Sequence, residues 1–367
     1  MKKINLLFSA AVLLLAASSC SKKSGPTPTP TDPGTGLTNI TYLGNTDMST
    51  ARSSLAAAGF GGSVFFAGGS TDNGTTASKA VDVYDALQNV WYTGNLTEAR
   101  YMLAGAAAGA KIAFGGGKTA TGFSKTVDIY DLTKNIWLTG QLSEARAGLA
   151  AAALGNTIIF AGGKGTAGVS KTVDIYNTNT NTWTTAQLSV ARTGLAAAAA
   201  GTKIVFAGGD NDAGVPLNTV DIYDTNTQAW TTATLSSAKD HFAGAGAGNK
   251  IVFAGGQTVA AGLVKTADIY DASTNTWTTG EISQAREDLA AAGVPNKIVF
   301  AGGYTGASSS TVADIYDIKS GTWTTASITT GRNLLAGAST DFTIMFGGGV
   351  SANGISKSAD IFHLSND

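Results

Sequence analysis

Side chains that could do chemistry gather in the second half of the chain, close to short glycine doublets. They are carboxylates, an amide, an imidazole and a phenol, at Asp210, Asp212, Asp240, His241, Gln257, Glu287, Asp288 and Tyr304. Two cations, Lys239 and Arg286, each stand directly before an acidic residue of this set. Brought to one opening, such groups would bind sugar hydroxyls or a cation. The alternative is a solvated loop surface on which nothing constrains these positions.

Two classes of hydrolase can be weighed on the same residues. A paired-carboxylate glycosidase could use Glu287 or Asp288 with Asp240, because two carboxylates at a suitable separation suffice, but the sequence does not fix their distance. A serine hydrolase would have to use His241 beside Asp240, and the chain has no GxSxG motif. We therefore assign no catalytic residue and favour a binding role over an enzymatic one.

Composition excludes several other kinds of site. The 367 residues include one cysteine, which rules out an intramolecular disulfide framework, a cysteine-rich zinc site and a CxxC redox motif. Two histidines leave little room for histidine-based metal catalysis, and Asp210-Asn211-Asp212 matches only the start of a calcium loop. We expect no metal and no cofactor. Twenty-four basic and 25 acidic residues give a net charge of −1, which argues against a nucleic-acid partner.

The first 37 residues differ in character from the rest of the chain. Two lysines, an apolar run from Ile4 to Ala17 and a few small residues lead to Cys20, the only cysteine. This resembles a bacterial lipoprotein signal, although Ala17 stands where leucine is commonest. The resemblance implies that residues 1–19 are a removed signal peptide and that lipid is attached to Cys20. The alternative is an ordinary secretory signal with a chance cysteine, and either would place the protein outside the cytoplasm.

Residues 20–37 are expected to be the lipidated cysteine and a spacer. The segment from Ser21 to Gly36 holds four prolines among Thr, Ser and Gly, a composition that cannot bury a core. Ser21, rather than an aspartate, after the cysteine is typical of outer-membrane sorting. We therefore expect a cell-envelope protein with a lipid anchor in the outer membrane, on a side of it that the sequence leaves open.

Residues 38–367 repeat one motif seven times. Its tryptophans recur at intervals of 46, 46, 47, 47 and 46, and each follows a tyrosine by seven residues. A glycine doublet precedes each tyrosine, and a basic residue begins each repeat, at Arg52, Arg100, Arg146, Arg192, Lys239, Arg286 and Arg332. A period in this range, with no helical pattern to interrupt it, predicts a propeller or solenoid.

An apolar strand ending in Gly-Gly, then a tyrosine, then a tryptophan resembles the kelch family over about nine-tenths of the chain. The resemblance implies an all-β, seven-bladed kelch-type β-propeller of four-stranded blades. The seventh repeat lacks its tryptophan, and Tyr42 lies upstream of Arg52 near the matching position. We therefore predict that the N-terminal strand closes the last blade, which hides both sheet edges.

Propellers of this family usually bind ligands on the face that carries the basic residues. The seven cations either make that face attract anions or pair with repeated aspartates such as Asp82 and Asp128 as scaffolding, which we favour because they occur in every blade. The resulting prediction is a monomeric binding module for a glycan or an envelope protein. The alternative is a sugar-modifying enzyme of the sialic-acid mutarotase type. Copper-radical sugar oxidases also resemble this fold, but the propeller segment has no cysteine to form their crosslink.

Overall fold

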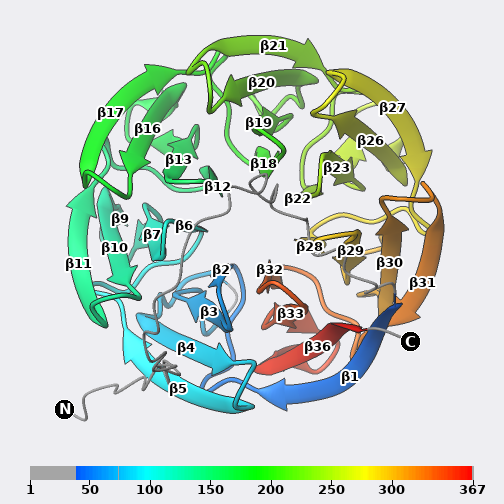
Figure 1. Ribbon diagram of the computed structural model, residues 1–367, viewed down its shortest axis with the longest axis horizontal. Helices are drawn as coiled ribbons and strands as arrows, with labels where there is room; N and C mark the ends of the chain where they lie inside the picture. The colour runs from blue at the N-terminus through cyan, green and yellow to red at the C-terminus, as the bar shows by residue number, and fades with distance from the viewer. Residues whose placement is uncertain (1–38, 73, 366–367) are drawn as a thin grey trace, which may run out of the picture.

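Seven four-stranded antiparallel sheets form a closed ring (Figure 1). A computed structural model describes residues 39–72 and 74–365. Within this part of the chain no helix is long and apolar enough to cross a membrane. The predicted signal peptide, Cys20 and the spacer lie outside the described residues. The predicted fold class, an all-β seven-bladed propeller, is confirmed.

Each blade runs from an inner strand beside the axis to an outer strand at the rim. Blade one consists of β2 (Ala56–Phe60), β3 (Ser63–Ala67), β4 (Ala80–Asp85) and β5 (Val90–Asn95); blade two of β6 (Ala104–Ala108), β7 (Lys111–Gly115), β10 (Thr126–Asp131) and β11 (Ile136–Gln141); and blade three of β12 (Ala150–Leu154), β13 (Thr157–Ala161), β16 (Thr172–Asn177) and β17 (Thr182–Gln187). Blade four consists of β18 (Ala196–Ala200), β19 (Lys203–Ala207), β20 (Thr219–Asp224) and β21 (Trp230–Thr234), and blade five of β22 (Ala243–Ala247), β23 (Lys250–Ala254), β26 (Thr266–Asp271) and β27 (Thr276–Glu281). Blade six consists of β28 (Ala290–Val294), β29 (Lys297–Ala301), β30 (Val312–Asp317) and β31 (Trp323–Ser327), and blade seven of β32 (Ala336–Ser339), β33 (Thr343–Gly347), β36 (Ser358–Ser365) and β1 (Asn39–Asp47).

Short hairpins follow the glycine doublet in four blades. They are β8 (Lys118–Thr119) with β9 (Gly122–Phe123), β14 (Lys164–Gly165) with β15 (Gly168–Val169), β24 (Gln257–Thr258) with β25 (Gly262–Leu263), and β34 (Val350–Ser351) with β35 (Gly354–Ile355).

The first strand of the chain closes the last blade, as predicted. Strand β1 pairs antiparallel with β36, and Tyr42 lies opposite Phe362 in this pairing. The same register joins Tyr84 to Trp91 in blade one. The two rings of the closing pair lie 5.2 Å apart, so Tyr42 occupies the position of the missing tryptophan.

Small residues let the inner strands approach one another around the axis. A Cβ atom on Gly59 would lie 2.0 Å from the carbonyl oxygen of Ser339 in the neighbouring blade, and one on Gly246 would lie 2.1 Å from that of Ala199. The inner strands surround a central cavity of about 210 Å³ lined by alanine, glycine and one serine. A larger side chain on this edge would force the blades apart.

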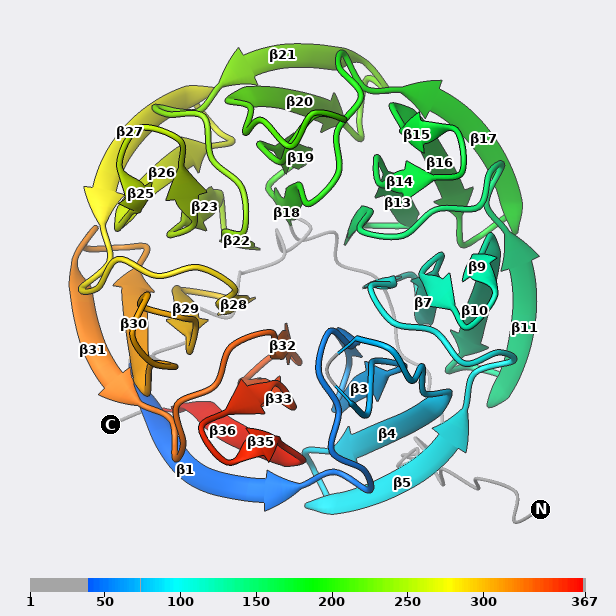
Figure 2. The ribbon, with the colours of Figure 1, turned by 180° about the vertical axis from the view of Figure 1, so that it is seen from behind.

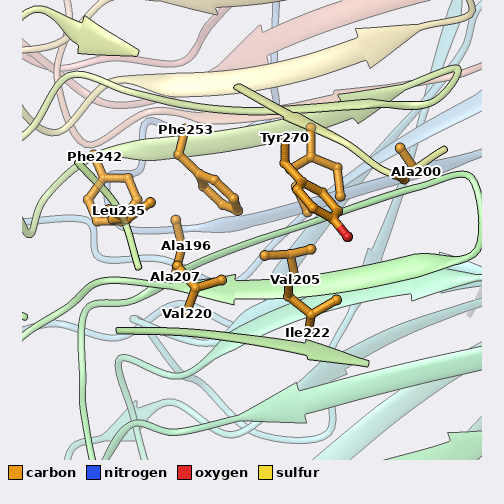
Figure 3. Close-up of a cluster of buried hydrophobic side chains, with 13 residues drawn as sticks. Ala196, Ala200, Val205, Ala207, Val220, Ile222, Leu235, Phe242, Phe253 and Tyr270 are labelled. Carbon is orange, nitrogen blue, oxygen red and sulfur yellow. The ribbon is translucent and has the colours of Figure 1, made fainter. Parts of the chain in front are cut away.

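Aromatic side chains fill the space between blades farther from the axis. Figure 3 shows Phe253 and Tyr270 of blade five lying against Val205 and Ile222 of blade four. The phenol of Tyr270 donates a hydrogen bond to Asn275 Oδ1 at 2.7 Å, so its polar end is satisfied although the ring is buried. The other blades repeat this packing, and the result is a rigid disc that holds its loops in place.

A buried cation fastens each blade to the loop that enters it. In blade one the guanidinium of Arg52 pairs with Asp82 and donates to the carbonyls of Gly68 and Ala80 at 2.6 and 2.7 Å. The other oxygen of Asp82 accepts the backbone N–H of Ser49 at 2.9 Å. All seven repeated basic side chains are 0% exposed, and each pairs with an aspartate of its own blade. The predicted scaffolding role is confirmed, and these seven charges do not form an anion-attracting surface.

Candidate functional site

One face of the disc carries both the loops that enter each blade and the loops that follow each glycine doublet. We call this the loop face; Figure 2 looks onto it, with the hairpins β14–β15 and β25 in front. In every blade the residue after the buried cation forms an antiparallel bridge with the residue after the doublet, as in Asp240 with Gln257 and Glu287 with Tyr304. The repeat therefore places equivalent positions at equal intervals around the axis.

The next residue of each blade forms a ring around the opening. We call this ring the collar; its members are Ser54, Met102, Gly148, Gly194, His241, Asp288 and Leu334. All seven have a positive φ, between 50° and 64°. Six backbone hydrogen bonds of 2.8 to 3.0 Å join collar residues of adjacent blades head to tail, for example from the N–H of Leu334 to the carbonyl of Asp288. The collar thus fixes the backbone from which its side chains project.

Five of the predicted residues come together on one side of this opening. We call Asp210, Asp240, His241, Glu287 and Asp288 the acidic cluster. The imidazole Nδ1 of His241 lies 3.2 Å from Asp240 Oδ1, and the N–H of Asp288 donates to the carbonyl of His241 at 2.8 Å. The side chain of Asp240 is 7% exposed and that of His241 is 47% exposed, so a buried carboxylate contacts a partly exposed imidazole.

Electrostatic interactions within the acidic cluster shift the pKa values of its members. The close contact with the Asp240 carboxylate, opposed by partial burial and helped by the other carboxylates, raises the pKa of His241 to about 9. Burial, followed by the charge of Asp240, raises the pKa of Asp210. Burial also raises the pKa values of Glu287 and Asp288. Four carboxylates therefore share one imidazolium, and a cation entering the cluster would stabilise their charged forms.

The remaining predicted residues lie elsewhere. Asp212 is exposed and pairs with Lys164 at 3.1 Å. The hydroxyl of Tyr304 donates to the carbonyl of Gly306 in its own loop at 2.9 Å, and the amide of Gln257 lies 3.5 Å from the Nδ1 of His241. Gln257 thus borders the cluster, while Asp212 and Tyr304 use their polar atoms on other partners.

Lys239 and Arg286 do not contribute to the site, and the prediction is corrected on this point. Both side chains are 0% exposed beneath the loop face. Lys239 pairs with Asp268 at 2.8 Å, and Arg286 pairs with Asp314. Both cations are used in buried ion pairs within their blades. The acidic cluster therefore lacks the two cations that stand beside it in the sequence.

The repeats match known family models. The model of the KLHDC2/KLHL20/DRC7 Kelch-repeats domain matches residues 52–240, more than half of the chain, and that of the Kelch motif matches residues 285–328. The chain belongs to the kelch-repeat family. A comparison with curated proteins finds no match.

Two apolar residues of this kelch propeller lie in the collar without having been predicted as site residues. Met102 is 46% exposed and Leu334 is half-buried, and both occupy collar positions where blades three and four carry glycine. The sequence does hold a clue to these two residues, because the repeats align them with Gly148 and Gly194, and glycine readily adopts a positive φ. Composition alone gives no reason to connect an apolar side chain with a polar site.

The kelch propeller also has a hollow between blades one and two. It has a volume of about 400 Å³ and is lined mainly by threonine and alanine with Glu98. The carboxylate of Glu98 accepts a hydrogen bond from Ser124. Among residues 39–72 and 74–365, no three or more His, Cys, Asp or Glu side chains are placed to hold a metal ion together.

The pairing of His241 with Asp240 predicts an unusual titration. By NMR we expect the His241 imidazole to titrate near pH 9, and in Asp240→Asn its pKa should fall toward the ordinary value of about 6.5. A folded-state pKa above the unfolded value means that the stabilisation is complete below about pH 6.5 and is lost as the pH rises through about 9.

His363, which contacts Thr343 and lies in the third strand of blade seven, supplies the internal control. Its resonance should not respond to Asp240→Asn. Titration of His241 near pH 6.5 in the unmodified protein would contradict the pairing.

Proposed function

We propose that this kelch propeller is a protein-binding module that receives a lysine or arginine side chain of its partner at the acidic cluster. One observation carries the proposal: the repeated charges are consumed by the scaffold, while unrepeated carboxylates gather at one side of the opening. Membership in the kelch-repeat family supports a protein-binding role. The loop face suits this role, because binding residues are often carried on loops that a rigid scaffold positions.

The charge of the cluster favours a cation over a neutral ligand. Partly buried carboxylates are costly to ionise alone, and the raised pKa values of Asp210, Glu287 and Asp288 record that cost. An ammonium or guanidinium group would offset it and form charge-assisted hydrogen bonds, which are about twice as strong as neutral ones. A sugar hydroxyl would supply hydrogen bonds but no charge, so a glycan ligand is the weaker alternative.

Selection from a random peptide library tests this proposal. Twelve-residue peptides displayed on phage would be panned against the purified chain and, in parallel, against the Asp240→Asn, Asp288→Asn double variant. We expect peptides rich in lysine or arginine from the first selection and loss of that enrichment in the second, because the variant removes two charges from the cluster while nearly keeping its shape.

Thermal denaturation of the variant controls for its folding, and a thermal-shift series with neutral and acidic sugars runs beside the selection. Selection of acidic peptides, or of none, would overturn the proposal. A shift with one sugar class, without basic enrichment, would favour the glycan alternative, and turnover of that sugar would favour the mutarotase-like one.

We propose in addition that the propeller is held at the cell envelope by lipid on Cys20. The basic and apolar start of the chain and the proline-rich segment before Asn39 support this proposal. Mass spectrometry of the protein expressed in a bacterium fed an alkyne-labelled fatty acid tests it. We expect an N-terminus at Cys20 that carries the label and a Cys20→Ala variant that does not. An unlabelled protein cleaved at another residue would point to simple secretion.

A further inference from the structure

We infer that the collar side chains Met102 and Leu334 are ligand-contact residues that select a partner segment in which apolar residues flank the cationic one. This inference rests on the proposed function and extends it from a charge to a pattern.

Met102 and Leu334 occupy a backbone conformation that suits neither of them. Their φ values are 53° and 52°, in the left-handed region that favours glycine. Asparagine, aspartate and histidine tolerate this region better than other side chains do. The positive φ therefore does not stabilise methionine or leucine at these positions. Strained backbone of this kind is concentrated at functional sites, so it points to a functional role for both side chains.

Glycine is compatible with the same position in this very fold. Gly148 and Gly194 have φ values of 64° and 62° at the equivalent points of blades three and four. Gly148 donates to the carbonyl of Met102, so glycine and methionine support the same collar hydrogen bonds. Because the fold accepts glycine there, closure of the ring does not explain the side chains of Met102 and Leu334.

The opposite face of the disc provides a contrast. Asn89, Asn181 and Asn275 also have positive φ, at 55°, 57° and 58°. Each accepts a hydrogen bond of 2.7 Å from the tyrosine hydroxyl of its own blade, so these side chains have a structural task. Met102 is 46% exposed, and neither it nor Leu334 belongs to the packed clusters of the described core.

The order of residues around the collar indicates the ligand. Leu334 is bonded to Asp288, directly beside the acidic cluster. On the other side of His241, Gly194 and Gly148 separate the cluster from Met102 along the collar. A segment lying across the opening would place a cation among the carboxylates and apolar residues over Leu334 and Met102. Methionine suits such a contact because its flexible thioether adapts to different shapes.

Glycine substitutions separate a contact role from a structural one. We expect Met102→Gly and Leu334→Gly each to keep the melting temperature of the unmodified protein or raise it by about 1–3 °C, because strain is relieved. Each should weaken binding of a library-selected basic peptide by about fivefold or more, as for a contact at the centre of an interface. Fluorescence anisotropy with the labelled peptide and thermal denaturation give the two readouts.

Asn275→Gly on the opposite face is the matched control, with a lower melting temperature and unchanged peptide affinity expected. A fall in melting temperature in the Met102 or Leu334 variants would show a structural role and overturn the inference. Unchanged affinity in both variants would overturn it as well, while leaving the proposed function intact. Absence of any basic peptide that binds the unmodified protein would overturn the proposed function and this inference together.

Discussion

The buried pair of a cation and an aspartate is the interaction on which the rest of the propeller depends. Desolvating two charges is expensive, and it is tolerated only where further hydrogen bonds satisfy the remaining donors and acceptors. Arg332 meets this requirement by pairing with Asp360 and donating to the carbonyls of Gly348 and Ser358. One guanidinium thus ties together the entering loop, the glycine doublet and the third strand. The aspartate pair and the hydrogen bond to the third strand recur in every blade, with lysine as the cation in blade five.

This scaffold explains how the loop face is free to differ from blade to blade. The bridges beside each cation and the hydrogen bonds of the collar are made by backbone atoms, so they do not depend on which side chains project. Residues that are adjacent in the sequence can therefore differ in role, one belonging to the scaffold and the next to the candidate site. Arg286 is locked under the surface, whereas Glu287 and Asp288, the next two residues, belong to the acidic cluster.

Periodicity made most of the fold predictable. The tryptophan ladder and the glycine doublets indicated seven blades, and the missing tryptophan of the last repeat led to Tyr42 and the closing strand. The buried pairs of a cation and an aspartate could also be predicted, because a basic residue present in every repeat pairs most simply with an aspartate present in every repeat. Comparison of the copies then pointed to Asp210, Asp240, His241, Glu287 and Asp288, which the structure brings to one side of the opening.

What could not be predicted depends on burial and backbone angles. Lys239 and Arg286 look like site residues in the sequence because they stand beside acidic ones, but their side chains are buried in the blade, where each pairs with an aspartate. The positive φ of Met102 and Leu334 accompanies hydrogen bonds between collar residues of adjacent blades, which no single repeat reveals. Local sequence therefore identified the polar half of the opening and missed its apolar half.

The most direct test compares two adjacent residues, Arg286 and Glu287, in chemical denaturation and in binding of a library-selected basic peptide. We expect Arg286→Met to lower the free energy of unfolding by about 3–5 kcal/mol, because Asp314 is left buried without its partner. We expect Glu287→Gln to change the free energy of unfolding by no more than about 0.5 kcal/mol and to weaken peptide binding. A stable Arg286→Met protein, or a Glu287→Gln protein that loses stability and keeps its affinity, would contradict the division between scaffold and site.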